Sequence, residues 1–350
     1  MVLWTHTSGL RKISTFFIVT NIILVLVFTI GSWNLSTVSA GSVDHNIGNL
    51  DIIGMSDYGR IGDRSIYWNG VEQTAAVSQD RPYHGLVLDH SQYDHSGGDY
   101  GIADWWDSFN SPVFPDFKVT DSDQSIIFEE NSFNQQKSIC SFTQVDATGD
   151  IGVGYDVRVH QTVWTLAGKD WAIVEWRIEN LLITDLTQVH VGMEVFSSSA
   201  SAANWFGVDG DQADDLDYWD DVNDIYYLQD DSLKTTGYSS ADVLNPLDHY
   251  YAEETNFFGD DKSAYNALTG ADGLAKNDPQ FDFGTDPIYS LVSWNNRIIP
   301  ADGEMAFAIV IACGSNDVTL LNAIRDAQDF WESTRLKITE IQDSPDANER

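Results

Sequence analysis

The apolar residues of positions 150–198 alternate with polar ones, and this alternation constrains the fold more than any other feature of the chain. Val157 and Val159 fall on one parity, while Arg158 and His160 fall on the other. A period of two residues is typical of a strand with one buried face. The pattern therefore predicts a β-strand here and favours a protein built on sheets.

Two more strands are predicted to follow directly. A turn at 167–170 leads into an apolar segment at 171–178, and after Thr184 and Asp185 a third alternating segment covers 189–195. Short polar turns between such segments are typical of antiparallel hairpins. We expect the three strands to form an antiparallel meander at the centre of the sheet.

Further strands and one helix are predicted outside this meander. Asn69-Gly70 is a strong hairpin signal, and apolar residues at helical spacing after Asn316 or Asp317 indicate a final helix capped by one of these two residues. The other predicted strands cover 52–53, 65–68, 75–77, 85–88, 117–119, 125–128, 138–145, 288–294 and 304–312. The chain is thus expected to be mainly β, a large antiparallel β-sandwich with long loop insertions and a C-terminal helix.

A single domain is expected over 41–340, because no Pro-rich linker and no internal repeat divides the chain. Within it, residues 199–284 are rich in Asp, Tyr, Asn and Gly. We interpret them as an insertion at one end of the sandwich that contains a helix over 262–268. Residues 341–350 are expected to be a disordered tail.

Residues 1–40 have the features of a secretory signal. A basic pair precedes an apolar run at 13–30, and Val38 and Ala40 supply the small residues of a cleavage site. We expect cleavage after Ala40 and export to the cell surface or the extracellular space. The alternative is an uncleaved anchor, because a run of about 18 apolar residues is close to spanning length. In that case the chain would meet the membrane only through this segment.

The charge balance excludes one class of partner. The chain has 54 acidic and 18 basic residues, a net charge of -36. Such a surface repels nucleic acid and anionic lipid and attracts cations. We expect no nucleic-acid partner. Two explanations of the acidity stay open, namely capture of calcium and adaptation to high or marine salt.

The two cysteines, Cys140 and Cys313, both fall in strand-like segments. An even pair in an exported protein is a candidate disulfide. Two buried free thiols are the alternative, since connectivity cannot be read from a sequence. We expect the disulfide because of the predicted compartment.

An aspartate-rich segment is the strongest candidate for a ligand site. Ten aspartates occupy residues 209–231, where the average acidity of the chain would give about three or four. Calcium prefers six to eight oxygen ligands, which such a segment can supply, although its spacing is not that of an EF-hand. A solvated, salt-adapted loop is the alternative. The predicted calcium ligands are Asp209, Asp211, Asp214, Asp215, Asp217, Asp220, Asp221 and Asp224.

Aromatic residues in loop-like, Asp-rich surroundings form a second candidate site. Aromatic faces beside carboxylates suit sugar rings, by stacking and by hydrogen bonds to hydroxyl groups. The alternative is a satellite core that holds the long insertion together. The predicted ligand-binding residues are Trp105, Trp106, Trp205, Tyr218 and Trp219.

Catalytic signals are weak. The repeated Asp-His pairs at 89–90 and 94–95 suit a transition metal but lack a third fixed ligand. Glu175 and Glu194 are a candidate carboxylate pair for glycoside hydrolysis, although both positions also suit strands that face solvent. No HExxH, GxSxG or phosphate-binding loop is present. We predict no catalytic residue.

The chain resembles β-sandwich regions of secreted bacterial and archaeal surface proteins, of the kind found beside subtilisin-like peptidases or ahead of sorting domains. The resemblance rests on DWAIVEWRIENLLITDLTQVHVGMEV, on GVDGDQADDLDYWDDVNDIYYLQD and on IIPADGEMAFAIVIACGSNDVTLLNAIRDAQDFW, about half the chain. It transfers no catalytic residue, and the turn at 300–303 is longer than in those regions. The central strands also look like sandwiches of the galactose-mutarotase type, which implies a fold and not an activity.

Three functional hypotheses follow. The first is an exported, acidic, calcium-binding β-sandwich without enzymatic activity, whose partner is a polysaccharide or another surface protein. The second is a glycan-active enzyme on a similar scaffold. The third is a structural subunit of a surface filament or sheath.

Overall fold

The computed structural model describes part of the chain, which includes its strands and its C-terminal helix. The described residues are 42–56, 61, 65–72, 83–89, 103–104, 117–118, 123–131, 134–144, 156–197, 216–220, 222–229, 235–253, 266, 268–270, 281–282 and 288–342. The predicted signal at 1–40, and with it the question of cleavage or anchoring, lies outside these residues. No helix in the described part combines the length and the apolar character that a membrane crossing requires.

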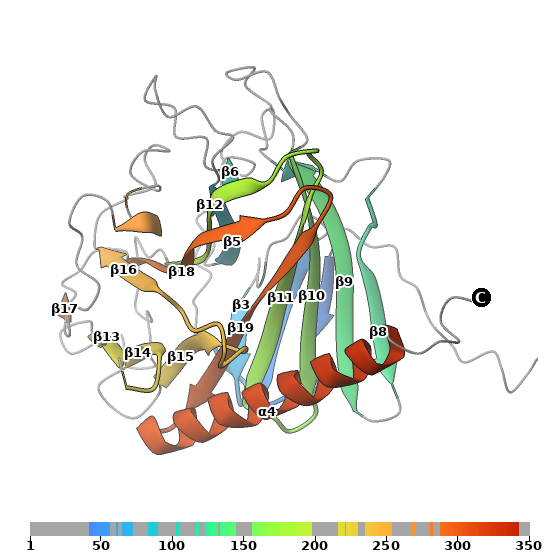
Figure 1. Ribbon diagram of the computed structural model, residues 1–350. Coiled ribbons are helices and arrows are strands. Elements are labelled where there is room, and N and C mark those ends of the chain that lie inside the picture. The colour runs from blue at the N-terminus through green and yellow to red at the C-terminus, as the bar shows by residue number, and fades with distance from the viewer. Residues whose placement is uncertain are drawn as a thin grey trace, which may run out of the picture. The chain divides into compact units, whose positions relative to one another are not determined.

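The described residues form three antiparallel sheets and one long helix, α4 (Asp317–Gln342) (Figure 1). The first sheet has the order β1 (Ser42–His45), β2 (Leu50–Ser56), β3 (Ser65–Trp68), β4 (Val71–Glu72). The second has the order β17 (Phe281–Asp282), β13 (Leu216–Asp220), β14 (Ile225–Gln229), β15 (Thr235–Ser240), β19 (Glu304–Gly314), β11 (Trp171–Asn180), β10 (Val157–Leu166), β9 (Gln135–Gln144), β7 (Phe117–Lys118), with β8 (Ile127–Asn131) also on β9. The third has the order β16 (His249–Glu253), β18 (Ile288–Ile299), β12 (Leu186–Ser197), β5 (Tyr83–Asp89), β6 (Ala103–Asp104). The expected β-sandwich class with a C-terminal helix is confirmed.

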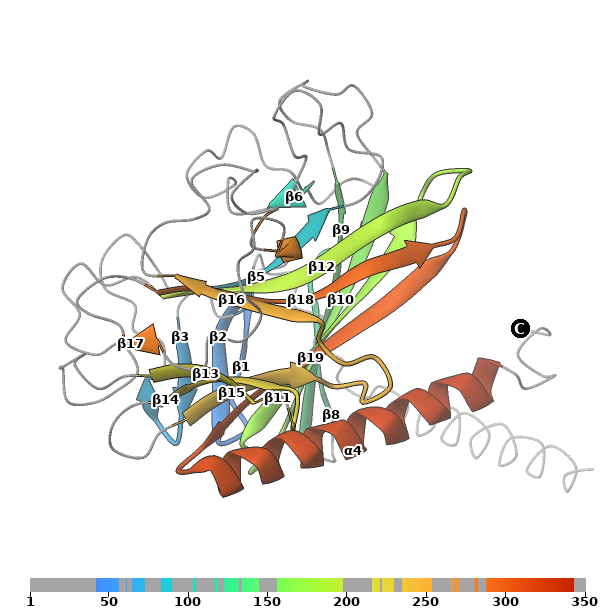
Figure 2. The ribbon, with the colours of Figure 1, turned by 60° about the vertical axis from the view of Figure 1, so that its left-hand side comes forward.

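The ten-stranded sheet contributes to a core on each of its faces. On one face Phe307 of β19 packs against Trp294 of the five-stranded sheet, with ring centroids 5.5 Å apart. On the other face Trp164 of β10 meets Trp331 of α4 at 5.6 Å, so that α4 lies along this face (Figure 2). Because α4 covers only part of the face, the remainder carries polar side chains such as Arg158.

The expected three-stranded meander is wrong at its third strand. β10 and β11 pair as a hairpin, but β12 pairs with β18 and β5 in the other sheet. Asn180 explains the crossing, because its buried Nδ2 donates to the carbonyl oxygens of Thr184 (2.9 Å), Ile299 (3.1 Å) and Pro300 (3.0 Å). The chain therefore turns a corner between the sheets, at the point where β18 and β19 make the same crossing.

In the described part of residues 199–284, β13, β14 and β15 extend the ten-stranded sheet and β16 extends the five-stranded one. These described strands are therefore integral to the two sheets. Asn316 caps the N-terminus of α4, since its Oδ1 accepts from the Thr319 amide at 3.0 Å. α4 continues to Gln342, two residues into the segment expected to be disordered.

Cys140 and Cys313 are both buried, and the structure has no disulfide between them. Cys140 lies on β9 and Cys313 on β19, and β10 and β11 run between these strands. Neighbouring strands are about 4.8 Å apart, so the two cysteines are separated by at least about 14 Å. A disulfide requires Cα atoms within about 7 Å of each other.

Candidate functional site

A groove between the β13–β14 hairpin, the loop at 241–248 and the N-terminal half of α4 is a concave site formed by described residues. It consists of two adjoining cavities of ≈ 140 Å³ and ≈ 270 Å³, which share Asn223 and Leu321. Segments more than 90 residues apart in sequence form its walls. We call it the α4 groove.

Local hydrogen bonds shape the hairpin wall of the α4 groove. Asp220 accepts from the backbone amides of Val222 (3.0 Å) and Asn223 (3.1 Å), and its second oxygen accepts from Asn223 Nδ2 at 2.6 Å. Asp and Asn favour such turns because their short polar side chains bond to nearby backbone groups. Asp224 has a positive φ of 57° and accepts from the Leu247 amide at 2.9 Å, which ties the hairpin to the loop.

The helical wall is fixed by close packing at the start of α4. Gly314 ends β19 directly under the helix, and a Cβ at this position would collide with the backbone of Leu320. Leu320 and Ile324 are buried against the sheet, while Asp317 and Val318 in the first turn are exposed. Asp317 suits this place because a carboxylate is favourable near a helix N-terminus.

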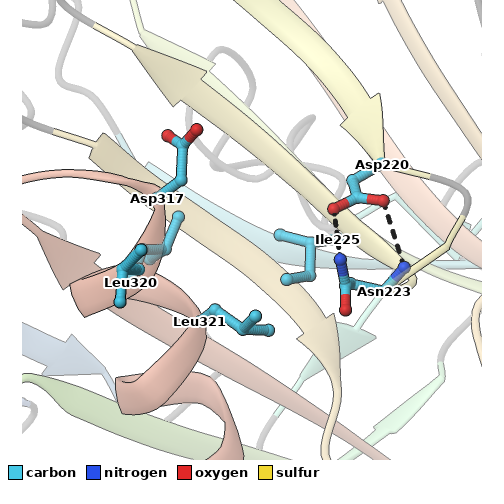
Figure 3. A pocket seen from close by; sticks show the side chains of 7 residues that line it. Asp220, Asn223, Ile225, Asp317, Leu320 and Leu321 are labelled. Atoms are coloured by element: carbon cyan, nitrogen blue, oxygen red, sulfur yellow. Dashed lines mark hydrogen bonds between the residues drawn. The ribbon is translucent and has the colours of Figure 1, made fainter.

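Exposed aliphatic side chains line the α4 groove. They are Val222, Val243 and Val318, with exposed fractions of 86 %, 62 % and 68 %, and Leu244, which follows Val243 in the loop, is 79 % exposed. Three large apolar side chains this exposed at one concavity are unusual for a surface that meets only water. In the smaller cavity Asp220 and Asp317 lie on opposite sides of Ile225, above Leu320 and Leu321 (Figure 3).

Two of the predicted calcium ligands, Asp220 and Asp224, have side chains that the structure describes. Both carboxylates are used in local hydrogen bonds, as given above. Asp217 is placed by its backbone alone, on β13. The other predicted ligands, Asp209, Asp211, Asp214, Asp215 and Asp221, lie outside the described residues. Within the described part, no three His, Cys, Asp or Glu side chains lie close enough to hold a metal ion.

The predicted sugar-stacking aromatics are also only partly described. Trp219 is 8 % exposed and belongs to the main core, so its ring is not available for stacking on a sugar. Tyr226 and Tyr238 nearby stack on each other in the same core at 5.8 Å. Tyr218 is placed by its backbone on β13. Trp105, Trp106 and Trp205 lie outside the described residues.

Glu175 and Glu194 do not form one site. Glu175 lies on β11, on the face opposite to the one through which Trp176 joins the main core, whereas Glu194 lies on β12 in the other sheet. Asp89 is buried on β5, paired in register with His190, while the rest of the two Asp-His pairs lies outside the described residues.

Glu175 is nevertheless chemically distinctive. Burial raises its pKa from the ordinary 4.5 to about 7; the positive charges of Arg177 and Lys137 lower it, and the negative charge of Glu304 raises it. On the same part of the sheet Asp123, whose side chain is fully buried, accepts from Arg158 Nε at 3.0 Å. Arg158 Nη1 and His160 Nε2 both bond Glu179, at 3.1 and 3.2 Å. This polar half-face is a second candidate site.

Sequence patterns do not point to the α4 groove. Its walls combine two segments between residues 220 and 246 with the distant helix α4, and periodicity reports only which neighbours in sequence share a face. One local signal is present in Val243-Leu244, an apolar pair inside a turn-rich polar stretch. Such a pair on a loop marks either a core contact or a contact surface.

Comparison with known proteins adds little to this site. No protein-family model and no curated protein sequence matches the chain. A mutant heparan sulfate lyase from Pedobacter heparinus overlaps 76% of this chain and 33% of its own, at 7% identity and a TM-score of 0.37, so the chain spans about a third of the lyase.

Two smaller proteins overlap over most of their own length. A putative aldose 1-epimerase from Escherichia coli K12 overlaps 78% of this chain and 98% of its own, at 9% identity and a TM-score of 0.43. A putative mutarotase from Salmonella typhimurium overlaps 76% and 90%, at 10% identity and a TM-score of 0.38. At these TM-scores the similarities support no statement about activity, substrate or ligand.

Proposed function

We propose that this protein is an exported, acidic β-sandwich that works by binding, and that it holds a partner protein in the α4 groove. The observation that carries the proposal is that three exposed aliphatic side chains, Val222, Val243 and Val318, line a concave site. Aliphatic side chains suit a protein partner, whereas sugar rings stack on aromatic faces. Of the two kinds of partner suggested by the sequence, the groove favours a surface protein over a polysaccharide.

A random-peptide library displayed on phage tests this function. Peptides are selected on the purified protein and then challenged with the double variant Val222→Glu/Val318→Glu, which places charge on the rim at exposed positions. The control is Ile183→Glu, because Ile183 is 88 % exposed on the corner between the sheets and lines neither cavity. We expect peptides that bind the wild type and the control but not the double variant. If every selected peptide binds all three proteins alike, the groove is not a binding site.

Calcium binding by the segment 209–224 is the second part of the proposal. It is supported by the density of aspartates there, which repel one another unless a cation lies between them. We expect calcium chloride to raise the melting temperature more than magnesium chloride does at equal ionic strength. An ion at 100 times its dissociation constant contributes about 2.7 kcal/mol.

The matched variants for the calcium test lie in the same acidic segment. Asp211→Asn/Asp214→Asn/Asp215→Asn removes three predicted ligands, and Asp230→Asn/Asp231→Asn removes two carboxylates just beyond them. The calcium-specific rise should be lost in the first variant and kept in the second. An equal response of both variants to calcium and magnesium would indicate general screening of charge instead of a site.

A glycan-active enzyme remains the second candidate, favoured by one observation. Glu175, with a pKa of about 7, is protonated often enough at neutral pH to act as a general acid. Its second carboxylate would be Glu304, whose charge acts on Glu175, and not Glu194. Release of reducing sugar from a polysaccharide panel, abolished by both Glu175→Gln and Glu304→Gln, would establish the enzyme. Activity retained by both variants would exclude this pair.

A further inference from the structure

We infer that the smaller cavity of the α4 groove binds a lysine or arginine side chain, so that the partner presents a basic residue flanked by apolar ones. This inference rests on the proposed binding function of the groove and specifies its partner. The occupant is a basic, apolar segment of another protein.

The shape of the cavity fits one long side chain. Its volume of ≈ 140 Å³ is below the roughly 300–1,000 Å³ of cavities that hold whole small molecules. Its floor is aliphatic, made by Ile225, Leu320 and Leu321, and the carboxylates of Asp220 and Asp317 lie on opposite sides of it (Figure 3). Lysine and arginine combine an apolar stem with a charged end, which matches this floor and these sides.

The electrostatics of the cavity favour a cation. Neither Asp220 nor Asp317 forms an ion pair with any residue in the described part of the chain. Asp220 accepts three hydrogen bonds, but a carboxylate has about four acceptor sites, so it can still accept from an ammonium or guanidinium group. Two full negative charges outweigh the partial positive charge of about half a unit at the start of α4.

The larger cavity continues the same surface for the residues beside the basic one. It has a volume of ≈ 270 Å³ and is lined by Val222, Val243, Pro246 and Ile324 among others, with Arg325 as its basic residue. Its apolar lining suits aliphatic side chains of the partner. The cavities adjoin at Leu321, so one peptide segment can occupy both.

Other occupants fit less well. A bare metal ion would find only two carboxylates, and hard cations such as calcium take six or more oxygen ligands. A second copy of this chain carries the same net charge of -36 and would bring like charges together. A basic partner gains from the overall charge as well as from the cavity, because an acidic protein attracts cationic segments over distance.

Synthetic peptides test the inference. They copy the phage-selected peptides that bind the wild type but not the Val222→Glu/Val318→Glu variant. In each peptide every lysine or arginine is replaced in turn by norleucine, which keeps an apolar stem and removes the charge. We expect one replacement to weaken binding about tenfold, as loss of a charge-assisted hydrogen bond does. The variant Asp317→Asn should weaken the unmodified peptide similarly, and the two changes together should cost no more than either alone.

Control variants distinguish the loss of the carboxylate in the cavity from a general disturbance of the fold. Asp317→Glu keeps the charge and should keep binding, and Asp329→Asn, on an exposed position of the same helix, should bind as the wild type does. Groove-dependent peptides that tolerate norleucine at every basic position would overturn the inference and leave the binding function standing. If no peptide depends on the groove, the binding function and this inference both fail.

Discussion

At the scale of single residues, Glu175 makes the stability of the protein depend on pH. Its pKa rises from 4.5 in the unfolded chain to about 7 in the folded one, chiefly through burial. A carboxyl group shifted in this direction contributes stability that is fully present below the unfolded pKa and is lost as the pH rises through the folded pKa. Glu175 should therefore destabilise the fold at neutral and alkaline pH.

Replacement by glutamine tests this expectation. Glu175→Gln should raise the free energy of unfolding at about pH 8 by up to about 3 kcal/mol and change it little at about pH 4.5. Urea unfolding of both proteins at the two pH values measures the difference. Glu332→Gln, at a carboxylate that is 46 % exposed, should change little at either pH. Equal effects of Glu175→Gln at both pH values would contradict the assigned cause.

The buried His45 also makes the stability of the wild type depend on pH, so the effect of Glu175 has to be measured against the Glu175→Gln variant. Burial lowers the pKa of His45 from 6.5 to about 3. A histidine shifted in this direction contributes stability above its unfolded pKa and loses it as the pH falls towards the folded one. The pH windows of His45 and Glu175 overlap, so their opposite effects partly cancel in the wild type.

The cysteines give a second prediction at this scale. Cys140 and Cys313 are buried, and burial raises the pKa of Cys313 to about 12, so its reactive thiolate is scarce. Iodoacetamide should add no mass to the folded protein and two carbamidomethyl groups to the protein unfolded without reductant. Mass spectrometry of the intact chain measures this. A chain that gains the two groups only after reduction contains the disulfide.

At the scale of elements, the corner between the sheets depends on the side chain of Asn180. Asn180→Ala removes the donor to three carbonyl oxygens and the acceptor of the Leu182 amide, so it should cost roughly 2 to 3 kcal/mol. Asn180→Asp should cost at least as much, because a carboxylate would face three carbonyl oxygens. Chemical denaturation of the two variants measures both costs.

Thr184→Ala is the matched control for the corner. Thr184 contributes its backbone carbonyl to Asn180, and its own side chain is exposed. The loss of that side chain should change the free energy of unfolding by less than about 0.5 kcal/mol. A cost of Asn180→Ala as small as that of the control would show that the corner is held by backbone pairing alone.

The corner between the sheets shows which part of the fold the sequence could predict and which part it could not. Alternating residues predicted β10 and β12, and an apolar segment between two turns predicted β11, because these patterns are local. The crossing at Asn180 was missed, because a turn within one sheet and a turn between two sheets have the same polar composition. Trp219 was expected to meet a ligand since it lies among aspartates, yet composition does not tell which face other strands cover. The α4 groove depends on contacts between distant segments, which no local pattern reports.

At the scale of the whole molecule, self-repulsion of the surface should control stability. With 54 acidic and 18 basic residues, the folded chain concentrates negative charge that unfolding disperses. Raising sodium chloride from about 0.1 to about 1 M shortens the screening length from about 10 to about 3 Å and should raise the melting temperature by several degrees. Differential scanning calorimetry measures it, with potassium chloride giving the same rise. A fall in the melting temperature with salt would contradict this account.

The ladder between β11 and β19 also affects the order in which the protein can fold. It joins Trp171 to Ala312 and Glu179 to Glu304, so the centre of the largest sheet is completed by residues made more than 120 positions later. A nascent chain cannot close its sandwich until β19 has left the ribosome. Contacts this far apart in sequence form slowly, which lengthens the period in which a newly made chain exposes unpaired strand edges.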